Sequence, residues 1–178
     1  WNANEARWQE VTGSPSLFTL ENSALRTPLA FDPGTQWEYG TGIDWTGKMV
    51  EQVSGMTLGE YFAANLTGPL GMTDTAFTHS PSMLSRAAGL HARMPDGSLV
   101  PMELPAPENP EFEMGGGGLQ ATMSDYGKFI RMILNDGELD GTRVLRADTV
   151  AMMSQNHIGA LRVKELTTVA PQFSNNAE

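Results

Sequence analysis

The sequence lacks cysteine altogether, which excludes disulfide bonds and thiolate metal sites. It is also poor in basic residues: 11 Lys and Arg stand against 21 Asp and Glu, for a formal net charge of −10. A surface this acidic repels phosphate backbones, so we expect no nucleic-acid partner. Apolar runs stay well short of the roughly 18 residues that a transmembrane helix needs, so we expect no membrane span. None of these features decides the cellular compartment.

Motifs of several hydrolase classes are also missing. Gly-x-Ser-x-Gly and Ser-x-x-Lys do not occur, although a hydrolytic serine needs a base within hydrogen-bond reach. Ser124 has Lys128 four residues later, but we interpret Ser124 as a helix cap. His79, His91 and His157 are far apart and form no His-Glu-x-x-His motif, so we predict no metal site and no cofactor. The many carboxylates are scattered and indicate no acid–base pair.

The length of 178 residues suits one globular unit or most of one. The chain begins Trp-Asn-Ala, without a methionine, and ends without a capping pattern. We therefore expect residues 1–178 to be a segment of a longer protein.

Two helices are predicted in the first half of the chain. Residues 43–54 carry apolar side chains at three- and four-residue spacing, and Gly55 is placed to end the helix. Thr57 and Glu60 form a capping box that opens a second, short helix to about residue 65. The residues that share a face of the first helix are Ile43, Thr46, Gly47, Val50 and Val53, and the second helix presents Leu58, Tyr61, Phe62 and Leu66.

The region 73–113 has a weak pattern and six prolines. A Pro-Asp-Gly turn within it can join short strands at 89–94 and 98–102. An irregular region of this length is uncommon unless it has a task, so we expect it to line a cleft.

Helices dominate again after this region. Ser124 is interpreted as the cap of a helix that runs to about residue 135 and stops at Gly137, and residues 148–155 predict a last short helix. The side chains expected to face inward from the first of these are Phe129, Ile130, Ile133 and Leu134. The predicted fold class is mainly α with minor β.

Four consecutive glycines, Gly115 to Gly118, precede that helix. A phosphate-binding loop would continue with Gly-Lys-Ser/Thr, and Leu-Gln-Ala follows instead. We interpret the run as backbone that passes close to a ligand or to another segment of the chain.

Several short blocks follow one another between residues 31 and 155. They are Pro33-Gly34-Thr35-x-x-x-Tyr39, Val50-Glu51-x-Val53-Ser54-Gly55, Pro69-Leu70-Gly71-Met72-x-Asp74-Thr75, Gly116-Gly117-Gly118-Leu119-x-x-Thr122-x-x-Asp125-Tyr126, Leu134-Asn135-x-Gly137-Glu138-Leu139-Asp140-Gly141 and Val144-Leu145-x-x-Asp148-Thr149-Val150. In this order they resemble the β-lactamase-related serine hydrolases. That superfamily includes class C β-lactamases, family VIII carboxylesterases, D-aminopeptidases and acyltransferases of the lovastatin-synthesis type.

The resemblance implies catalysis by a Ser-x-x-Lys motif upstream of a tyrosine, which is Tyr39 here. A phenol with a pKa of about 10 is a poor base at neutral pH, so a nearby ammonium must stabilise its phenolate. The family's Tyr-x-Asn motif has Thr41 at its third position, which favours the esterase branch over β-lactam hydrolysis. His157 begins a His-x-Gly copy of the third family motif, but it follows a helix too closely. We predict that this copy is a decoy and that the true element lies beyond Glu178.

The resemblance also implies a fold, a function and a partner. Residues 1–178 would be part of a hydrolase domain: the helical subdomain of the β-lactamase/transpeptidase-like α/β fold, with the sheet domain largely supplied by N- and C-terminal parts of the same hydrolase. Gly116 and Gly117 fall where related enzymes line the acyl side of the cleft, or they form a tight turn before a helix. The expected function is cleavage of carboxylic esters through an acyl-enzyme, on a small-molecule ester or amide substrate.

Other functions stay open at this point. Within the superfamily they are β-lactamase, D-Ala-D-Ala peptidase-like and acyltransferase activity. From other classes they are a catalytically inactive relative that binds peptidoglycan or another ligand, and an unrelated helical interaction domain. The last predicts no cleft beside Tyr39.

Overall fold

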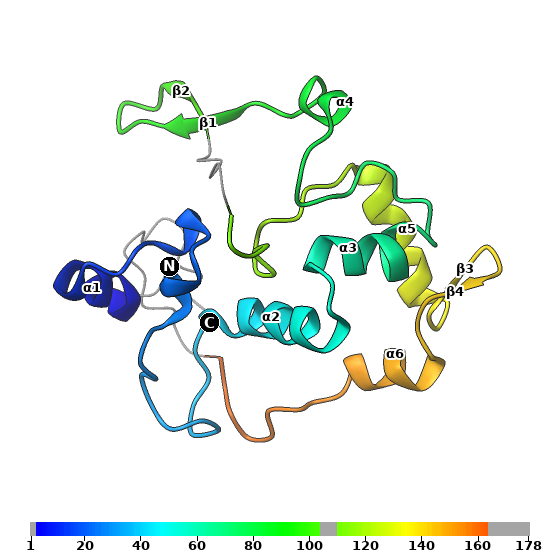
Figure 1. The fold of residues 1–178 in the computed structure, drawn as a ribbon, viewed down its shortest axis with the longest axis horizontal. Helices are drawn as coiled ribbons and strands as arrows, with labels where there is room; N and C mark the ends of the chain where they lie inside the picture. The colour runs from blue at the N-terminus through cyan, green and yellow to red at the C-terminus, as the bar shows by residue number, and fades with distance from the viewer. Residues whose placement is uncertain (1–2, 104–109, 164–178) are drawn as a thin grey trace.

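The computed structural model describes residues 3–103 and 110–163. Short helices joined by turns make up most of these residues, and the strands form two two-stranded antiparallel sheets (Figure 1). The elements, in chain order, are α1 (Ala3–Thr12), η1 (Leu17–Thr19), η2 (Asn22–Leu25), α2 (Gly42–Ser54), α3 (Leu58–Phe62), η3 (Ala63–Thr67), α4 (Pro81–Leu84), β1 (Leu90–Arg93), β2 (Leu99–Met102), α5 (Met123–Leu134), β3 (Glu138–Leu139), β4 (Thr142–Arg143) and α6 (Ala147–Met153).

The boundaries predicted for α2 and the predicted start of α3 are confirmed. Gly55 ends α2 in the left-handed conformation, with φ of 68°. The capping box of α3 is complete: the Glu60 amide donates to Thr57 Oγ1 at 3.1 Å, and the Thr57 amide donates to Glu60 Oε2 at 2.8 Å. The helix continues past the predicted end as the π-helical turn η3, where the Gly68 amide donates to the Ala63 carbonyl.

The face that the predicted residues of α2 share is only partly buried. The buried residues of this helix are Asp44 and Gly47, whereas Ile43 and Val53 are exposed, Val53 by 85%. Gly47 is buried because Leu58 of α3 packs onto it, so closely that a Cβ on Gly47 would lie 3.1 Å from the leucine side chain. The helix therefore turns a narrow, partly polar face toward α3. Its larger apolar side chains point outward; they are Ile43, Trp45, Met49 and Val53.

The start and the buried face of α5 also differ from the prediction. Thr122, not Ser124, caps the helix: its hydroxyl accepts from the Asp125 amide at 3.2 Å. Met132 is fully buried, while Ile130 and Leu134 are exposed, Leu134 by 76%. Two polar residues with cap chemistry lie two positions apart here, and the backbone uses the first.

Two apolar clusters hold the described residues together. The first joins the turn after η3 to α5 and β3, around Leu70, Met72, Met132 and Leu139. The second joins the N-terminal 3-10 helices to the segment before the glycine run, around Leu25, Phe112 and Met114. Figure 1 shows this segment directly above the beginning of α2. The second cluster therefore anchors the glycine run near the N-terminus of that helix.

A buried carboxylate, Asp125, links α5 to the segment between η3 and α4. Its Oδ2 accepts from the Asp74 amide at 2.8 Å and from the Thr75 hydroxyl at 3.1 Å, and its Oδ1 lies 2.9 Å from Lys128 Nζ. Lys128 also donates to the Gly71 carbonyl. Burial raises the pKa of the Asp125 carboxyl, but the bonds from Lys128, the Asp74 amide and Thr75 together lower it further, so this pKa lies below its usual value.

The stabilising effect of Asp125 depends on pH in one direction. Its contribution is fully present above the unfolded-state pKa, about 3.9, and is lost as the pH falls through the lower folded-state value. We expect the wild-type protein to have a higher free energy of unfolding than Asp125→Asn. The difference should be constant above about pH 5 and should shrink below about pH 4. Urea unfolding at a series of pH values measures this difference. A difference that stays constant down to about pH 2 would contradict the assignment.

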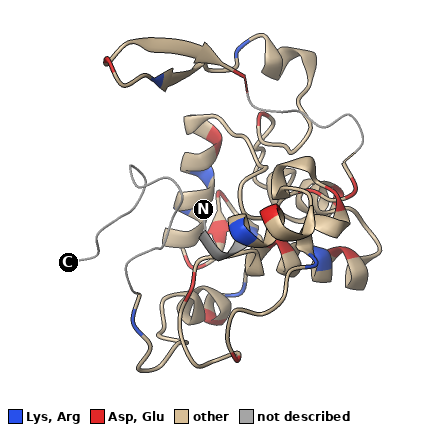
Figure 2. Cartoon of the chain, turned by 90° about the vertical axis from the view of Figure 1, so that its left-hand side faces the viewer, with Lys and Arg blue, Asp and Glu red and all other residues tan. Residues whose placement is uncertain are grey.

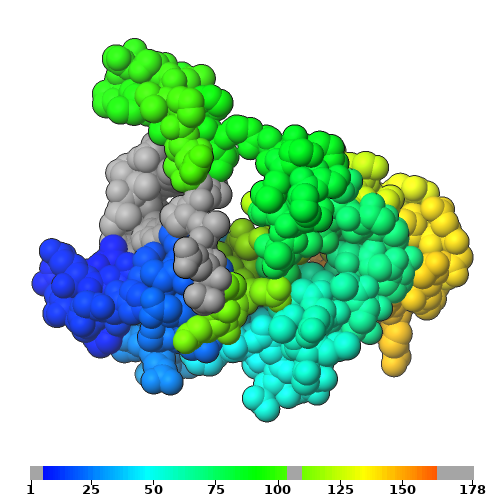
Figure 3. All heavy atoms as spheres, turned by 45° about the horizontal axis from the view of Figure 1, so that its top comes forward, coloured from blue at the N-terminus to red at the C-terminus, as the bar shows by residue number. Residues whose placement is uncertain are grey.

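The region 73–113 contains the predicted hairpin. β1 pairs with β2 from Leu90 opposite Met102 to Arg93 opposite Leu99, and Gly97 in the connecting turn has φ of 85°. Most of its residues are exposed, and Figure 3 shows the hairpin as a projection from the rest of the chain. The short helix α4 was not predicted. Residues 104–109 of this region lie outside the described residues.

Candidate active site

The predicted catalytic tyrosine lies in the irregular segment directly before α2. Tyr39 is 57% exposed, so its ring is not part of a packed core. Thr41 follows as the N-cap residue of α2, and its carbonyl accepts from the amides of Asp44 and Trp45, each at 3.1 Å. The Thr41 side chain does not cap the helix. An N-cap side chain usually accepts a hydrogen bond from a backbone N–H of the first helical turn. The Thr41 hydroxyl is not used in this way.

The glycine run forms a turn against the same end of α2. The Gly118 amide donates to the Met114 carbonyl at 2.9 Å, which closes the turn. The Gly116 amide donates to Asp44 Oδ1 at 3.0 Å, and Asp44 is only 2% exposed. A buried carboxylate in the first turn of α2 thus holds a loop that lies 72 residues further along the chain.

The close approach predicted for the glycine run is confirmed. A Cβ on Gly115 would lie 2.9 Å from the Ile43 carbonyl oxygen, and one on Gly116 would lie 3.0 Å from the Ile43 side chain and 3.2 Å from the Asp44 carboxylate. A Cβ on Gly117 would meet only the Met114 sulfur, at 3.4 Å. The structure therefore brings Gly116 and the helix end that follows Tyr39 and Thr41 to one place.

The packing at Gly115 and at Gly127 predicts that alanine substitutions at these two positions change the free energy of unfolding in opposite directions. Gly115→Ala pushes a methyl group against backbone, so we expect it to lower the free energy of unfolding by about 1–3 kcal/mol. Gly127 lies inside α5, and a Cβ there meets nothing within 4 Å. Gly127→Ala is expected to raise the free energy of unfolding by about 0.5–1 kcal/mol. Urea denaturation of both variants checks this, and a stabilised Gly115→Ala would contradict the described packing.

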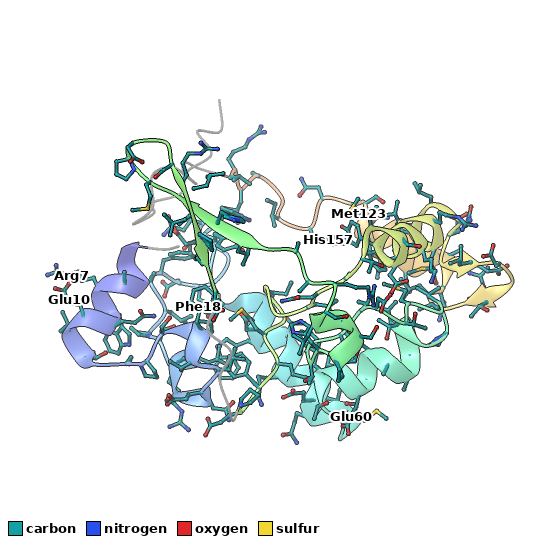
Figure 4. All side chains as sticks on the ribbon, turned by 90° about the horizontal axis from the view of Figure 1, so that it is seen from above. Arg7, Glu10, Phe18, Glu60, Met123 and His157 are labelled. Carbon is teal, nitrogen blue, oxygen red and sulfur yellow. The ribbon has the colours of Figure 1, made fainter. Side chains whose placement is uncertain are left out.

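The alternative catalytic candidates stay apart. Lys128 pairs with Asp125 rather than with Ser124, so the spacing of Ser124 and Lys128 forms no dyad. His157 contacts the Met152 carbonyl at 2.7 Å through Nε2, and residues 154–163 form no strand. Figure 4 shows His157 apart from Phe18 and from α1.

The part of the chain that the structure describes holds no group of three or more His, Asp or Glu side chains placed to bind a metal ion. Figure 2 shows acidic residues scattered over several elements. Within the same residues, each helix is too short or too polar to cross a membrane.

An open cavity of about 490 Å³ lies at the opposite end of α2. Its lining includes Lys48, Glu51, Gly55 and Glu60. Glu60 appears in Figure 4 at the outer edge of α3. Because α2 has 13 residues, its two ends are separated by about 20 Å. This cavity is therefore not the site beside Tyr39.

Residues 5–168 match the family model for Beta-lactamase. The chain belongs to the beta-lactamase family. Lovastatin esterase from Penicillium rubens is 36% identical over 166 residues, which make up 86% of this chain and 39% of that protein. Acyltransferase calJ from Penicillium decumbens is 34% identical over 145 residues, which make up 79% of this chain and 33% of that protein.

A solved structure supports the same membership of the beta-lactamase family. Unliganded simvastatin synthase (LovD) from Aspergillus terreus superposes with a TM-score of 0.69 at 32% identity, over 87% of this chain and 36% of that one. The chain therefore spans between a third and two fifths of the length of these relatives. The predicted superfamily is confirmed, and so is the fold class, a mainly helical part of the β-lactamase/transpeptidase-like fold.

Sequence reasoning missed one residue of this candidate site. Asp44 follows Tyr39 and Thr41 in the sequence, but its position alone indicates only an acidic residue in the first turn of a helix, where the helix dipole favours one. Its contact with Gly116 depends on a pairing 72 residues apart, and no local signal predicts that pairing.

Proposed function

We propose that this chain supplies the tyrosine-bearing part of an enzyme that cleaves carboxylic esters through an acyl-enzyme intermediate. The observation that carries the proposal is the meeting of the Tyr39 segment and the glycine loop at the N-terminus of α2, where Gly116 bonds to Asp44. Relatives named as a lovastatin esterase and as acyltransferases support acyl-group chemistry.

In the proposed mechanism, a serine from the remaining polypeptide attacks the ester carbonyl. The Tyr39 phenolate, stabilised by an ammonium from the same polypeptide, takes the serine proton as the C–O bond forms. The tetrahedral intermediate then expels the alcohol, which receives that proton from Tyr39, and leaves the acyl group on the serine. Water repeats the sequence in the second step: it loses a proton to Tyr39, and the serine regains one as the acid departs.

Thr41, Gly116 and Gly117 are proposed to contact the substrate. The Thr41 hydroxyl lies on the helix end that follows Tyr39 and is not used as a cap, so it suits a single hydrogen bond to the ester. Gly116 and Gly117 are exposed at the turn of the loop and carry no side chain. A wall of small residues there leaves room for a bulky acyl group.

The remaining N- and C-terminal parts of the same hydrolase are proposed to cover the outward face of α2. The exposed side chains Trp45, Met49 and Val53 recur at a spacing of four residues, which places them on one side of the helix. A continuous apolar stripe on a helix usually packs against another element. The irregular region 73–113 is proposed to line the resulting cleft.

Transfer of the acyl group to an alcohol other than water is the second candidate. It uses the same acyl-enzyme and differs only in the acceptor of the second step. Names of relatives such as acyltransferase calJ favour it specifically. Amide substrates, including β-lactams, are less favoured because Thr41 offers only one short hydroxyl, whereas an asparagine has separate carbonyl and NH2 groups that accept and donate at the same time.

The test uses the full-length protein, meaning this chain with its flanking polypeptide. Turnover of p-nitrophenyl butyrate is measured with and without an added alcohol acceptor, beside turnover of nitrocefin. We expect release of p-nitrophenol and little nitrocefin hydrolysis. Formation of a new ester at the expense of butyric acid would favour the acyltransferase. A folded protein that processes neither substrate would overturn the proposed function.

A further inference from the structure

We propose that Asp44 is a positioning residue that fixes the glycine loop against the Tyr39 segment and thereby sets the acyl-chain selectivity of the enzyme. This inference rests on the proposed function, because selectivity has meaning only for an acyl-transferring site. Asp44 is not assigned any contact with the reacting atoms.

Asp44 is buried and accepts a hydrogen bond from the glycine loop. A carboxylate that is 2% exposed is costly unless donors satisfy it. The Gly116 amide supplies one such donor at 3.0 Å. On its other side, the Asp44 backbone amide donates to the Thr41 carbonyl at 3.1 Å. One residue therefore connects Thr41, a proposed substrate contact, to Gly116, another.

The segment that leads into the glycine loop is held by contacts that do not involve Asp44. The Glu111 carboxylate accepts from the Asn22 amide at 2.6 Å, and Glu113 accepts from the Gly59 amide at the start of α3. These two contacts fix the residues that lead into the glycine run. Within the described residues, the side-chain hydrogen bond of Gly115–Gly117 is the one that the Gly116 amide donates to Asp44 Oδ1. Without this bond, the turn is held mainly by the local backbone hydrogen bonds that the Gly117 and Gly118 amides donate to the Met114 carbonyl.

Gly115 and Gly116 also pack closely on Ile43: a Cβ would lie 2.9 Å from the Ile43 carbonyl oxygen and 3.0 Å from the Ile43 side chain. Both groups stay in place when Asp44 is replaced and limit inward movement of the loop. We therefore expect a lost Asp44 contact to let the loop move outward. Outward movement loosens the wall that the proposed site presents to the acyl chain. The longer acyl chain then loses contacts that acetate never makes.

The experiment compares Asp44→Ala, Asp44→Asn and a control, Asp148→Ala, in the full-length protein. Asp148 pairs with Arg146 on an exposed part of α6, outside the proposed site. The readout is the ratio of kcat/KM for p-nitrophenyl butyrate to kcat/KM for p-nitrophenyl acetate. This ratio does not depend on the amount of active enzyme. Hydrogen–deuterium exchange of a peptide that covers the glycine loop is measured beside it.

Asp44→Ala is expected to lower this ratio about tenfold, the size of effect that small changes in a hydrophobic pocket produce. Exchange in the glycine loop should become faster. Asp44→Asn keeps an acceptor oxygen at the same position, so it should preserve both readouts, as should Asp148→Ala. Should Asp44→Ala not fold, Asp44→Ser carries the same test, because its hydroxyl is too short to reach the Gly116 amide.

Equal losses for both esters, with an unchanged ratio and unchanged exchange, would overturn the role of Asp44 while leaving the proposed function intact. A folded wild-type protein that hydrolyses neither ester would instead overturn the proposed function, and the selectivity role with it. The two failures are therefore distinguishable from one set of measurements.

Discussion

Tyr39→Phe in the full-length protein is expected to lower kcat/KM for p-nitrophenyl butyrate by about 10²–10⁴-fold, the range that a positioned acid–base group contributes. The substitution removes only the hydroxyl, which is the group proposed to carry the proton from the serine to the leaving alcohol. The ring is retained, and the side chain is 57% exposed, so little stability should be lost. Steady-state kinetics with the ester, and circular dichroism to verify folding, measure both effects.

The matched control is Tyr126→Phe. Tyr126 is 52% exposed, and its ring stacks on Phe129 in α5 with centroids 6.1 Å apart. It is therefore an exposed tyrosine like Tyr39, but it lies outside the proposed site. Loss of its hydroxyl should leave kcat/KM nearly unchanged. If Tyr39→Phe retained wild-type activity, or if both variants lost activity equally, Tyr39 would not be the proton-transfer residue.

Asp125→Ala is expected to cause the largest loss of stability, about 2–4 kcal/mol in the free energy of unfolding. The substitution leaves the Thr75 hydroxyl and the Asp74 amide without their acceptor and Lys128 without its counter-charge. The expected loss is below the upper range for buried pairs because the Lys128 side chain is 32% exposed, so water partly replaces the lost partner. Urea denaturation of the full-length protein measures it.

Glu138→Ala provides the comparison for that loss. Glu138 pairs with Arg143 at 2.7 Å, but both side chains are largely in water, at 41% and 50% exposure. Exposed pairs of this kind contribute about 0–1 kcal/mol. Similar effects of the two substitutions would show that the buried network around Asp125 does not hold α5 to the preceding turn.

The helix boundaries could be predicted where the signals are local. The capping box of Thr57 and Glu60, and Gly55 at the end of α2, each act within one turn of the backbone, so the sequence contains the whole interaction. Helix α1 was missed because its residues show no apolar stripe at helical spacing. The cap of α5 was misplaced because Thr122 and Ser124 carry equivalent chemistry.

The buried faces were harder to predict for a physical reason. A helical stripe of apolar residues indicates that some element will cover it, but not which element or on which side a given neighbour packs. In α2, the described neighbour α3 packs on Gly47, and the larger side chains Trp45 and Met49 point away from it. The spacing therefore indicates an apolar face, and the packed fold decides which of its side chains are buried.

The candidate site was predicted in part. The segments that contain Tyr39, Thr41, Gly116 and Gly117 resemble those of a known superfamily. Each segment is a weak signal alone, and their order along the chain indicates the superfamily. That the glycine loop reaches the first turn of α2 could not be read from either segment. Contacts between residues far apart in the sequence depend on the packed fold, and Asp44 became visible only there.

The most direct test of the account is covalent labelling of the full-length protein with a serine-reactive fluorophosphonate. The nucleophilic serine displaces fluoride and becomes phosphonylated, and peptide mapping by mass spectrometry locates it. The account predicts a single labelled serine in polypeptide outside residues 1–178, with slower labelling in Tyr39→Phe. A labelled serine within residues 1–178, such as Ser124, would contradict the division of catalytic groups proposed for this chain.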